Sequence, residues 1–175
     1  AGLEPLAGVS LRIVDDAGDS VSVGTEGTIE VSGPIVMTGY LDDPQATETT
    51  LAEGWLRTGD VGVLDNAGRL RVLDRRSDLI LSGGENVYPA EIESVLDDHE
   101  DVIEAGVCGV PDEKFGARPV AFLVLREGAS LDAEEMAEFC QARLASYKCP
   151  TTFNQSGVLP RTPTGKLIRR ALLDD

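Results

Sequence analysis

The segment LPRTPTGKLIRR, at residues 159–170, contains a lysine where this chain would ordinarily use an arginine. The whole sequence has twelve arginines and only three lysines, yet Lys166 lies between Gly165 and the apolar pair Leu167–Ile168. Lysine is a compact charge on a flexible stem, whereas arginine is a broad planar fork. Lys166 is therefore a candidate for meeting an anion in a narrow site. The alternative is an ordinary surface cation in the first turn of a helix.

The TPTGK sequence around Lys166 invites comparison with a phosphate-binding P-loop. That loop needs a glycine five positions before its second glycine and a serine or threonine directly after the lysine. Those two positions hold Pro160 and Leu167 here. The sequence thus excludes a P-loop, although a lysine on a Thr-Gly turn remains well suited to meet an anion.

Two other segments combine polar residues with turn residues. In GWLRTGD, at residues 54–60, Asp60 follows a glycine and precedes an expected strand, so its carboxylate can project from a turn. A fixed carboxylate can accept hydrogen bonds from both hydroxyls of a ribose, although an aspartate can also simply stabilise a turn. In DRRSDLILSGGENVYPAEIE, at residues 74–93, Gly83 and Gly84 allow close approach of the backbone to a ligand. A plain hairpin turn is the alternative.

These residues need elements to position them, and the first half of the chain predicts a small antiparallel β subdomain. Short apolar strands alternate with turn residues such as Asp-Asn-Ala-Gly at 65–68, which indicates hairpins. The expected strands in this half are residues 8–14, 27–31, 61–64 and 69–73.

The second half of the chain predicts an α+β domain. Pro89 suits the first position of a helix with Ile92, Val95 and Leu96 on one face. A second helix is expected from about Asp132 to Ser146, and a final short helix after Gly165. The expected strands here are residues 102–110 and 118–125.

Composition excludes several classes of function. With 42% hydrophobic and 26% charged residues the chain is globular, and its net charge of −16 disfavours nucleic acid and anionic membranes as partners. The sequence contains no apolar run of the roughly 20 residues that a membrane span needs, and no signal peptide at its start. We therefore expect a cytoplasmic protein. Its dispersed acids and scarce lysines suit a high-salt cytoplasm, as in halophiles.

Cysteine and histidine content predicts no metal site and no disulfide framework. The three cysteines, Cys108, Cys140 and Cys149, lack CxxC spacing, and the first two lie in apolar patterns typical of buried thiols. His99 is the only histidine. We expect it at the surface, near a helix C-terminus.

Taken together, the three polar segments resemble the later motifs of the adenylate-forming superfamily, which includes acyl-CoA synthetases, peptide-synthetase adenylation domains and luciferases. The resemblance covers nearly the whole chain. Besides the segments quoted above it includes GTIEVSGPIVMTGYLDDPQATETTLAEGWLRTGD at 27–60 and YKCP at 147–150. SGGENVYPAEIE looks most like acyl-CoA ligases of the fatty-acyl, aryl or succinylbenzoate kind.

The resemblance implies a reaction and roles for particular residues. ATP and a carboxylic acid would give an acyl-adenylate and pyrophosphate, after which CoA would displace AMP. Lys166 would be the catalytic cation of the first step, and Asp60 and Arg75 would bind the nucleotide. Ser77 would be the hinge, although the family usually has aspartate or lysine there. Gly83, Gly84 and Glu85 would line the pantetheine channel for CoA.

The resemblance also implies a domain arrangement. We expect residues 1–74 to be a β subdomain at the end of a large N-terminal domain, 75–78 the hinge, and 79–175 a mobile C-terminal domain. The family's Ser/Thr/Gly-rich phosphate loop and Thr-Glu motif are absent from these 175 residues. We therefore expect a C-terminal fragment that is inactive alone, with Mg²⁺ held by an N-terminal part of the same protein. The resemblance leaves room for a homodimer.

Two other functions fit the same motifs. One is a non-catalytic module that binds a nucleotide or CoA. The other is an adenylation domain that loads a carrier protein, against which no carrier-domain serine motif follows Lys166. The residues that would choose the acyl group are not recognisable in the sequence.

Overall fold

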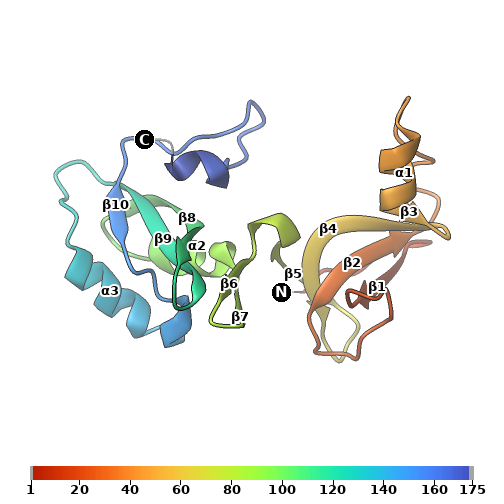
Figure 1. The fold of residues 1–175 in the computed structure, drawn as a ribbon, viewed down its shortest axis with the longest axis horizontal. Helices are drawn as coiled ribbons and strands as arrows, with labels where there is room; N and C mark the ends of the chain where they lie inside the picture. The colour runs from red at the N-terminus through yellow and green to blue at the C-terminus, as the bar shows by residue number, and fades with distance from the viewer. Residues whose placement is uncertain (1, 174–175) are drawn as a thin grey trace. The chain divides into compact units, whose positions relative to one another are not determined.

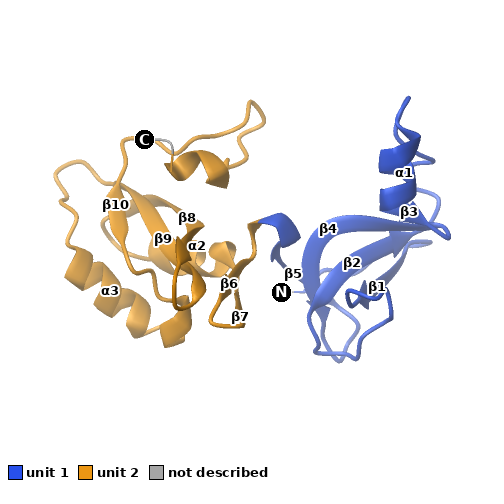
Figure 2. Cartoon of the chain, in the orientation of Figure 1, with its two compact units in different colours: residues 1–77 blue, residues 78–175 orange. Residues whose placement is uncertain are grey.

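The computed structural model describes residues 2–173 and divides the chain into two compact units (Figure 1). Unit 1 comprises residues 1–77 and unit 2 residues 78–175, as coloured in Figure 2. The boundary thus falls directly after Ser77. The predicted α+β class is confirmed. Unit 1 contains a sheet and only one short helix, and unit 2 contains a second sheet with two helices packed on it.

Unit 1 is a five-stranded antiparallel sheet in which β2 pairs with β1 and β4, and β4 also pairs with β3 and β5. Its small core contains Ile13, Ile29 and Leu70. The predicted hairpin at residues 65–68 joins β4 to β5, where Leu64 pairs with Leu70. The strands are β1 Ser10–Val14, β2 Gly27–Ser32, β3 Leu51–Ala52, β4 Trp55–Leu64 and β5 Leu70–Arg75.

Unit 1 also contains a short helix that the hydrophobic pattern did not predict, α1 Pro44–Thr50. None of its residues is buried, so it lacks the apolar periodicity by which helices are recognised. Local chemistry accounts for it instead. The Asp43 carboxylate caps the first turn by accepting from the Ala46 N–H at 2.9 Å, and Pro44 occupies the first position.

Unit 2 is built around β9, which pairs with β8 and β6 antiparallel and with β10 parallel. Side chains alternate between the two faces of the β8–β9 pair. Val107, Ala121 and Leu123 belong to the core with the two helices, whereas Cys108 and Phe122 contact the C-terminal segment. The elements are β6 Ile80–Ser82, β7 Glu85–Val87, α2 Pro89–Asp97, β8 Val102–Asp112, β9 Gly116–Leu125, α3 Ala133–Gln141 and β10 Phe153–Gln155.

The helices of unit 2 follow the predicted pattern with two corrections. Ile92 and Leu96 of α2 are fully buried, as the apolar spacing predicts. The second helix ends at Gln141, not near Ser146, with Ala142 as its C-cap, and the Arg143 side chain donates to the Phe139 carbonyl of its last turn. The prediction for His99 was wrong: it is only 6% exposed, because its ring packs edge-on against Phe139 of α3.

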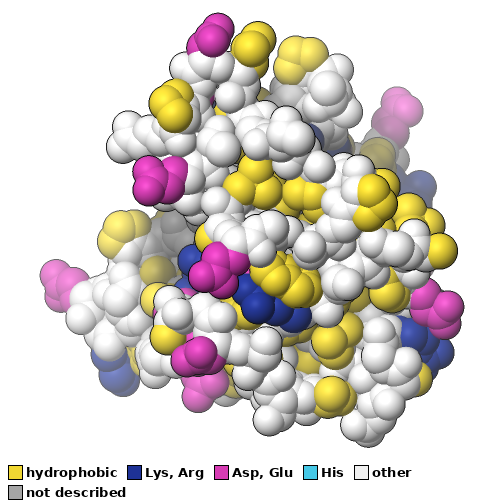
Figure 3. Space-filling model, turned by 90° about the vertical axis from the view of Figure 1, so that its right-hand side faces the viewer, with side chains coloured by type: hydrophobic (Ala, Val, Ile, Leu, Met, Phe, Trp, Pro, Cys, Tyr) yellow, Lys and Arg dark blue, Asp and Glu magenta, His cyan; other side chains and the backbone are white. Residues whose placement is uncertain are grey.

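Acidic side chains are dispersed on the face of the molecule that Figure 3 draws. They are scattered there among hydrophobic and other side chains and form no single patch. Among the described residues, no group of three or more His, Cys, Asp or Glu side chains is placed to hold a metal ion. No helix of residues 2–173 is both long and apolar enough to cross a membrane.

Candidate active site

Lys166 lies on a tight turn and not in a helix, contrary to one of the two interpretations of its sequence. The turn is closed by the Thr162 N–H donating to the Lys166 carbonyl at 2.8 Å and by the Gly165 N–H donating to the Thr162 carbonyl at 2.8 Å. The Thr162 hydroxyl also accepts from the Lys166 N–H at 3.0 Å. Gly165 adopts a φ of +86°, which favours glycine. The expected final helix is only a 3-10 segment, Arg169–Leu173.

Contacts on both sides hold this turn, residues 161–168, which we call the lysine loop. Arg161 pairs with Glu104 of β8 and donates to the Gly165 carbonyl. Leu167 packs against the cluster formed by Cys108, Val120 and Phe122. Within the described part of the chain the Lys166 side chain is exposed and has no hydrogen bond or ion pair. Its ammonium is therefore available to an external anion while its backbone is fixed.

The rest of the C-terminal segment covers one face of the sheet. Leu159 and Leu172 are both 2% exposed and pack over Gly106 of β8. A Cβ at Gly106 would lie 3.1 Å from a Leu159 methyl and 3.3 Å from the Leu172 methyls, so only glycine permits this approach without displacing them. The segment that carries Lys166 is thus anchored by apolar packing as well as by its turn.

The structure brings Asp60 and Arg75 together in unit 1, but Asp60 lies within β4 and not at the turn before a strand that its sequence predicted, because β4 begins at Trp55 and not at Val61. They are direct partners in the β4–β5 register, and the Arg75 Nε lies 2.9 Å from the Asp60 Oδ1. Their side chains are 31% and 50% exposed, so both remain open to solvent. Asp60 is oriented by Thr58, whose hydroxyl accepts from the Asp60 N–H at 3.1 Å and donates to the Ile29 carbonyl at 3.0 Å. A fixed, partly exposed carboxylate of this kind can accept from sugar hydroxyls.

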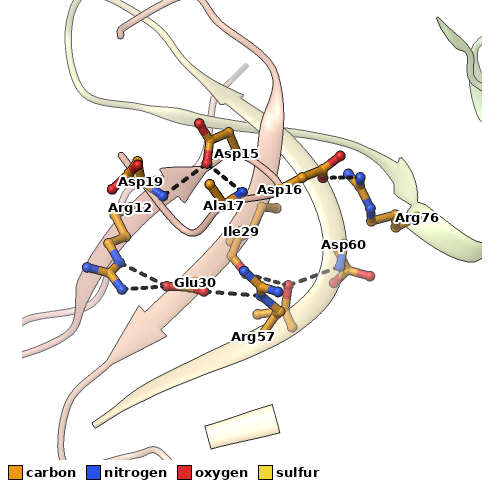
Figure 4. Close-up of polar contacts among 11 residues, drawn as sticks. Arg12, Asp15, Asp16, Ala17, Asp19, Ile29, Glu30, Arg57, Asp60 and Arg76 are labelled. Carbon is orange, nitrogen blue, oxygen red and sulfur yellow. Dashed lines mark hydrogen bonds and ion pairs between the residues drawn. The ribbon is translucent and has the colours of Figure 1, made fainter. Parts of the chain in front are cut away.

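Unit 1 also has an ion cluster that the sequence analysis missed. Glu30 of β2 has a largely buried side chain and lies between two arginines, with Arg12 at 2.8 Å and Arg57 at 3.2 Å (Figure 4). The Arg12 guanidinium also lies over the Trp55 ring at 4.2 Å. Because these residues come from three strands, no local spacing indicated the cluster. It ties β4, the strand that carries Asp60, to β1 and β2.

Gly83 and Gly84 form the two-residue turn between β6 and β7. Their φ angles of +62° and +88° are the left-handed values that such hairpins require, so the turn interpretation of this motif is sufficient to explain both glycines. A Cβ at Gly84 would meet no atom within 4 Å, and Glu85 is exposed. In Figure 1 this turn and the dark blue lysine loop lie at opposite ends of unit 2.

Ser77 lies in a short 3-10 turn, Arg76–Asp78, at the unit boundary. The residue before it is attached to unit 1, because Arg76 pairs with Asp16 (Figure 4). The residue after it is attached to unit 2, because Asp78 pairs with Arg169 at 2.8 Å. Each unit thus extends to within one residue of Ser77.

The cysteines are structural. All three are buried, as expected for Cys108 and Cys140, and burial raises the pKa of each thiol. The pKa of Cys140 rises to about 11, mainly through burial and then through its neighbour Cys149. A nucleophilic cysteine needs the opposite shift.

Comparison with known proteins identifies the family. The model of the AMP-binding enzyme C-terminal domain matches residues 91–166, and this match ends on Lys166. The 2-succinylbenzoate–CoA ligase of Bacillus licheniformis is 48% identical over 169 residues, 97% of this chain and 35% of the ligase. The chain belongs to the adenylate-forming superfamily. This confirms the resemblance drawn from the motifs.

Solved structures of the superfamily agree with the fold. The o-succinylbenzoate CoA synthetase of Bacillus subtilis, in complex with the acyl-adenylate intermediate OSB-AMP, matches 98% of this chain and 35% of its own with a TM-score of 0.94 and 48% identity. Another structure of that synthetase contains ATP and a magnesium ion. The amide bond synthetase McbA of Marinactinospora thermotolerans is 37% identical, with a TM-score of 0.90 over 98% of this chain and 35% of its own. The chain therefore spans about a third of the length of these superfamily members.

Proposed function

We propose that this chain provides the C-terminal part of an AMP-forming carboxylate–CoA ligase and that Lys166 is its catalytic cation. The observation that carries the proposal is the exposed Lys166 ammonium on a loop fixed from both sides, in a chain of the adenylate-forming superfamily. A positioned cation has most effect where charge develops in a confined site.

In the first step, an oxygen of the substrate carboxylate attacks the α-phosphorus of ATP. A bond forms between them, the bond from the α-phosphorus to the bridging oxygen breaks, and pyrophosphate leaves. Lys166 neutralises the charge on the carboxylate and α-phosphate oxygens during this step. Asp60 accepts from the ribose hydroxyls, and Arg75 both orients Asp60 at 2.9 Å and assists at the ribose or phosphate.

In the second step, the CoA thiol sulfur attacks the acyl carbon, the bond from that carbon to the phosphate oxygen breaks, AMP leaves, and the thiol proton passes to solvent. Residues 75–78 act as the hinge, centred on Ser77, and unit 2 rotates between the steps. Lys166 then withdraws, and Gly83, Gly84 and Glu85 line the channel for the pantetheine arm. The separation of the lysine loop from the β6–β7 turn within unit 2 supports this division, because one small body can present opposite ends in turn (Figure 1).

The remaining participants belong to the whole ligase. We propose that Mg²⁺ and the acyl group bind to an N-terminal part of the ligase; a structure of the Bacillus subtilis synthetase, of which this chain matches 35%, contains ATP and a magnesium ion. The acid to try first is 2-succinylbenzoate, which the curated relatives carry in their names. A homodimer remains a proposal of the same kind.

A joined ligase tests the proposal directly. The joined ligase consists of the Bacillus subtilis synthetase up to the residue where its similarity to this chain begins, followed by the 175 residues of this chain. We expect it to release pyrophosphate and form acyl-CoA from ATP, 2-succinylbenzoate and CoA, whereas its Lys166→Ala variant should release pyrophosphate far more slowly. The intact Bacillus subtilis synthetase is the positive control. A folded joined ligase that binds ATP and the acid but forms no acyl-adenylate would favour the non-catalytic module.

The acceptor of the acyl group needs its own measurement, because a relative of similar fold is named an amide bond synthetase. The same acyl-adenylate can pass to an amine or to a carrier protein. CoA, an amine and a carrier protein should therefore be offered separately to preformed acyl-adenylate. Rapid transfer to CoA alone supports the CoA ligase. Faster transfer to the amine or to the carrier protein would instead indicate an amide synthetase or a carrier-loading adenylation domain.

A further inference from the structure

A cluster of three charged side chains joins distant segments of unit 2. The Arg169 Nη2 lies 2.7 Å from the Glu93 Oε2 on α2, and its Nη1 lies 2.8 Å from the Asp78 Oδ2. The three side chains are only 14%, 14% and 23% exposed, in the order Arg169, Glu93, Asp78. Such shielding strengthens charge-assisted hydrogen bonds relative to those at an open surface.

The cluster needs the planar fork of an arginine. Nε and Nη2 of Arg169 donate to the two oxygens of Glu93, at 3.2 and 2.7 Å, while Nη1 reaches Asp78. The Glu93 Oε1 also accepts from the Val107 N–H at 2.9 Å, which ties the cluster to β8. A lysine presents a single point of charge and cannot occupy these three positions together.

Two members of the cluster lie close in sequence to proposed functional residues. Arg169 follows Lys166 by three residues, and Asp78 follows Ser77 directly. The ion pair between Asp78 and Arg169 therefore links the proposed hinge to the end of the lysine loop. Leu167 before Arg169 and Leu172 after it both pack against the same apolar cluster on the sheet, so Arg169 lies between two anchored residues.

We propose that Arg169 is a positioning residue, which holds the lysine loop to Asp78 and Glu93 so that Lys166 moves with unit 2 as one rigid body when the chain rotates at Ser77. The inference rests on the proposed function for the roles of Lys166 and Ser77. In this proposal Arg169 does not touch the reacting atoms, but it determines the position of the Lys166 ammonium in the active site.

Hydrogen exchange on the 175-residue chain tests the structural half of the inference without any activity. Arg169→Lys keeps the charge and loses the fork. We expect the amides of Gly165, Lys166 and Ile168 to exchange at least about tenfold faster, as loss of charged hydrogen bonds to a local segment implies. The amides of Ala121 and Leu123 in β9 should not change.

Two further variants make the result decisive. Arg170→Lys changes the exposed neighbouring arginine and should leave every amide as in the parent. Asp78→Asn removes the charge of one acceptor, so it weakens the hydrogen bond from Arg169 Nη1 and keeps the Glu93 pair; it should therefore loosen the same loop amides less than Arg169→Lys does. Unchanged loop amides in Arg169→Lys, or an equal increase at Ala121 and Leu123, would overturn the inference.

The joined ligase tests the functional half. Arg169→Lys should lower kcat for pyrophosphate release with little change in KM for ATP, because the nucleotide contacts lie elsewhere, and Arg170→Lys should match the parent. Transfer from preformed acyl-adenylate to CoA should stay at the parent rate. If the loop loosens and kcat is unchanged, the positioning role is refuted. If Lys166→Ala is itself active, the proposed function fails while the exchange result still stands.

Discussion

Replacing Lys166 separates catalysis from folding, because the structure assigns the lysine loop's stability to other groups. The Lys166 side chain is exposed, and the loop is held by backbone hydrogen bonds and by Arg161, Thr162 and Leu167. Lys166→Ala should therefore change the free energy of unfolding of the 175-residue chain by no more than about 0.5 kcal/mol. Urea unfolding of parent and variant measures this directly.

The same variant should strongly slow adenylation in the joined ligase. Loss of one positioned donor to a developing anion costs about 10²–10³-fold in kcat, or about 2.7–4 kcal/mol of barrier. Pyrophosphate release at saturating ATP and acid measures that step. With preformed acyl-adenylate and CoA, thioester formation should proceed at nearly the parent rate, because Lys166 has no part in the second step of the proposed mechanism.

Lys166→Arg distinguishes shape from charge. The charge is kept, and the guanidinium adds a broad fork that a narrow site cannot accept. We expect adenylation to fall substantially, though less than in Lys166→Ala. An arginine variant with parent adenylation would refute the argument for a compact cation. Equal losses in both half-reactions for Lys166→Ala would refute its restriction to the first step.

Four other outcomes follow from the fold. Gly84→Leu in the joined ligase should slow transfer to CoA while leaving pyrophosphate release largely intact, because its side chain would occupy the space beside the β6–β7 turn; the φ of +88° at Gly84 strains any side chain there, so Gly84→Ala serves as the control for backbone strain, and loss of pyrophosphate release in a folded Gly84→Leu variant would contradict the proposed channel. The purified 175-residue chain alone should release no pyrophosphate from ATP and 2-succinylbenzoate, and measurable release would overturn that expectation. With a net charge of −16, its melting temperature should rise with KCl as the Debye length falls from about 30 Å at 0.01 M to about 3 Å at 1 M, and a flat or falling curve would remove the halophile inference. Cys140 should resist alkylation in the folded chain until the pH approaches its raised pKa of about 11, because the reactive thiolate is scarce below it; rapid alkylation at pH 8 without unfolding would show that the buried position is wrong.

Much of the local structure was readable from the sequence. Several elements follow from short-range signals: strands β1, β2, β5, β8 and β9, the start of α2 at Pro89 and the start of α3 next to Asp132. Turn chemistry likewise indicated the hairpins, because positive φ angles and side-chain caps depend on residues next to one another. The motif order also indicated the superfamily, which the comparisons confirmed.

The candidate site was only partly readable. Lys166, Asp60 and Arg75 were identified from their motifs, but their roles stay proposals, and Thr58, Glu93 and Arg169 were missed as supports. Arg169 and Glu93 were present in the quoted motifs, and only their contact was hidden. Nothing in a linear pattern shows which carboxylate an arginine will meet.

The sequence by itself determined the elements and the kinds of chemistry available, because propensity, periodicity and turn residues act over a few positions. Tertiary structure alone decided that the lysine loop is a turn clamped on a sheet, that His99 is buried against Phe139, and that Arg169 spans to Asp78 across 91 positions. These features depend on packing of segments distant in the chain, where a charge or ring finds its partner only after the sheet has formed. Long-range contacts of this kind hold the backbone of the lysine loop in place, and the proposed role of Lys166 depends on them.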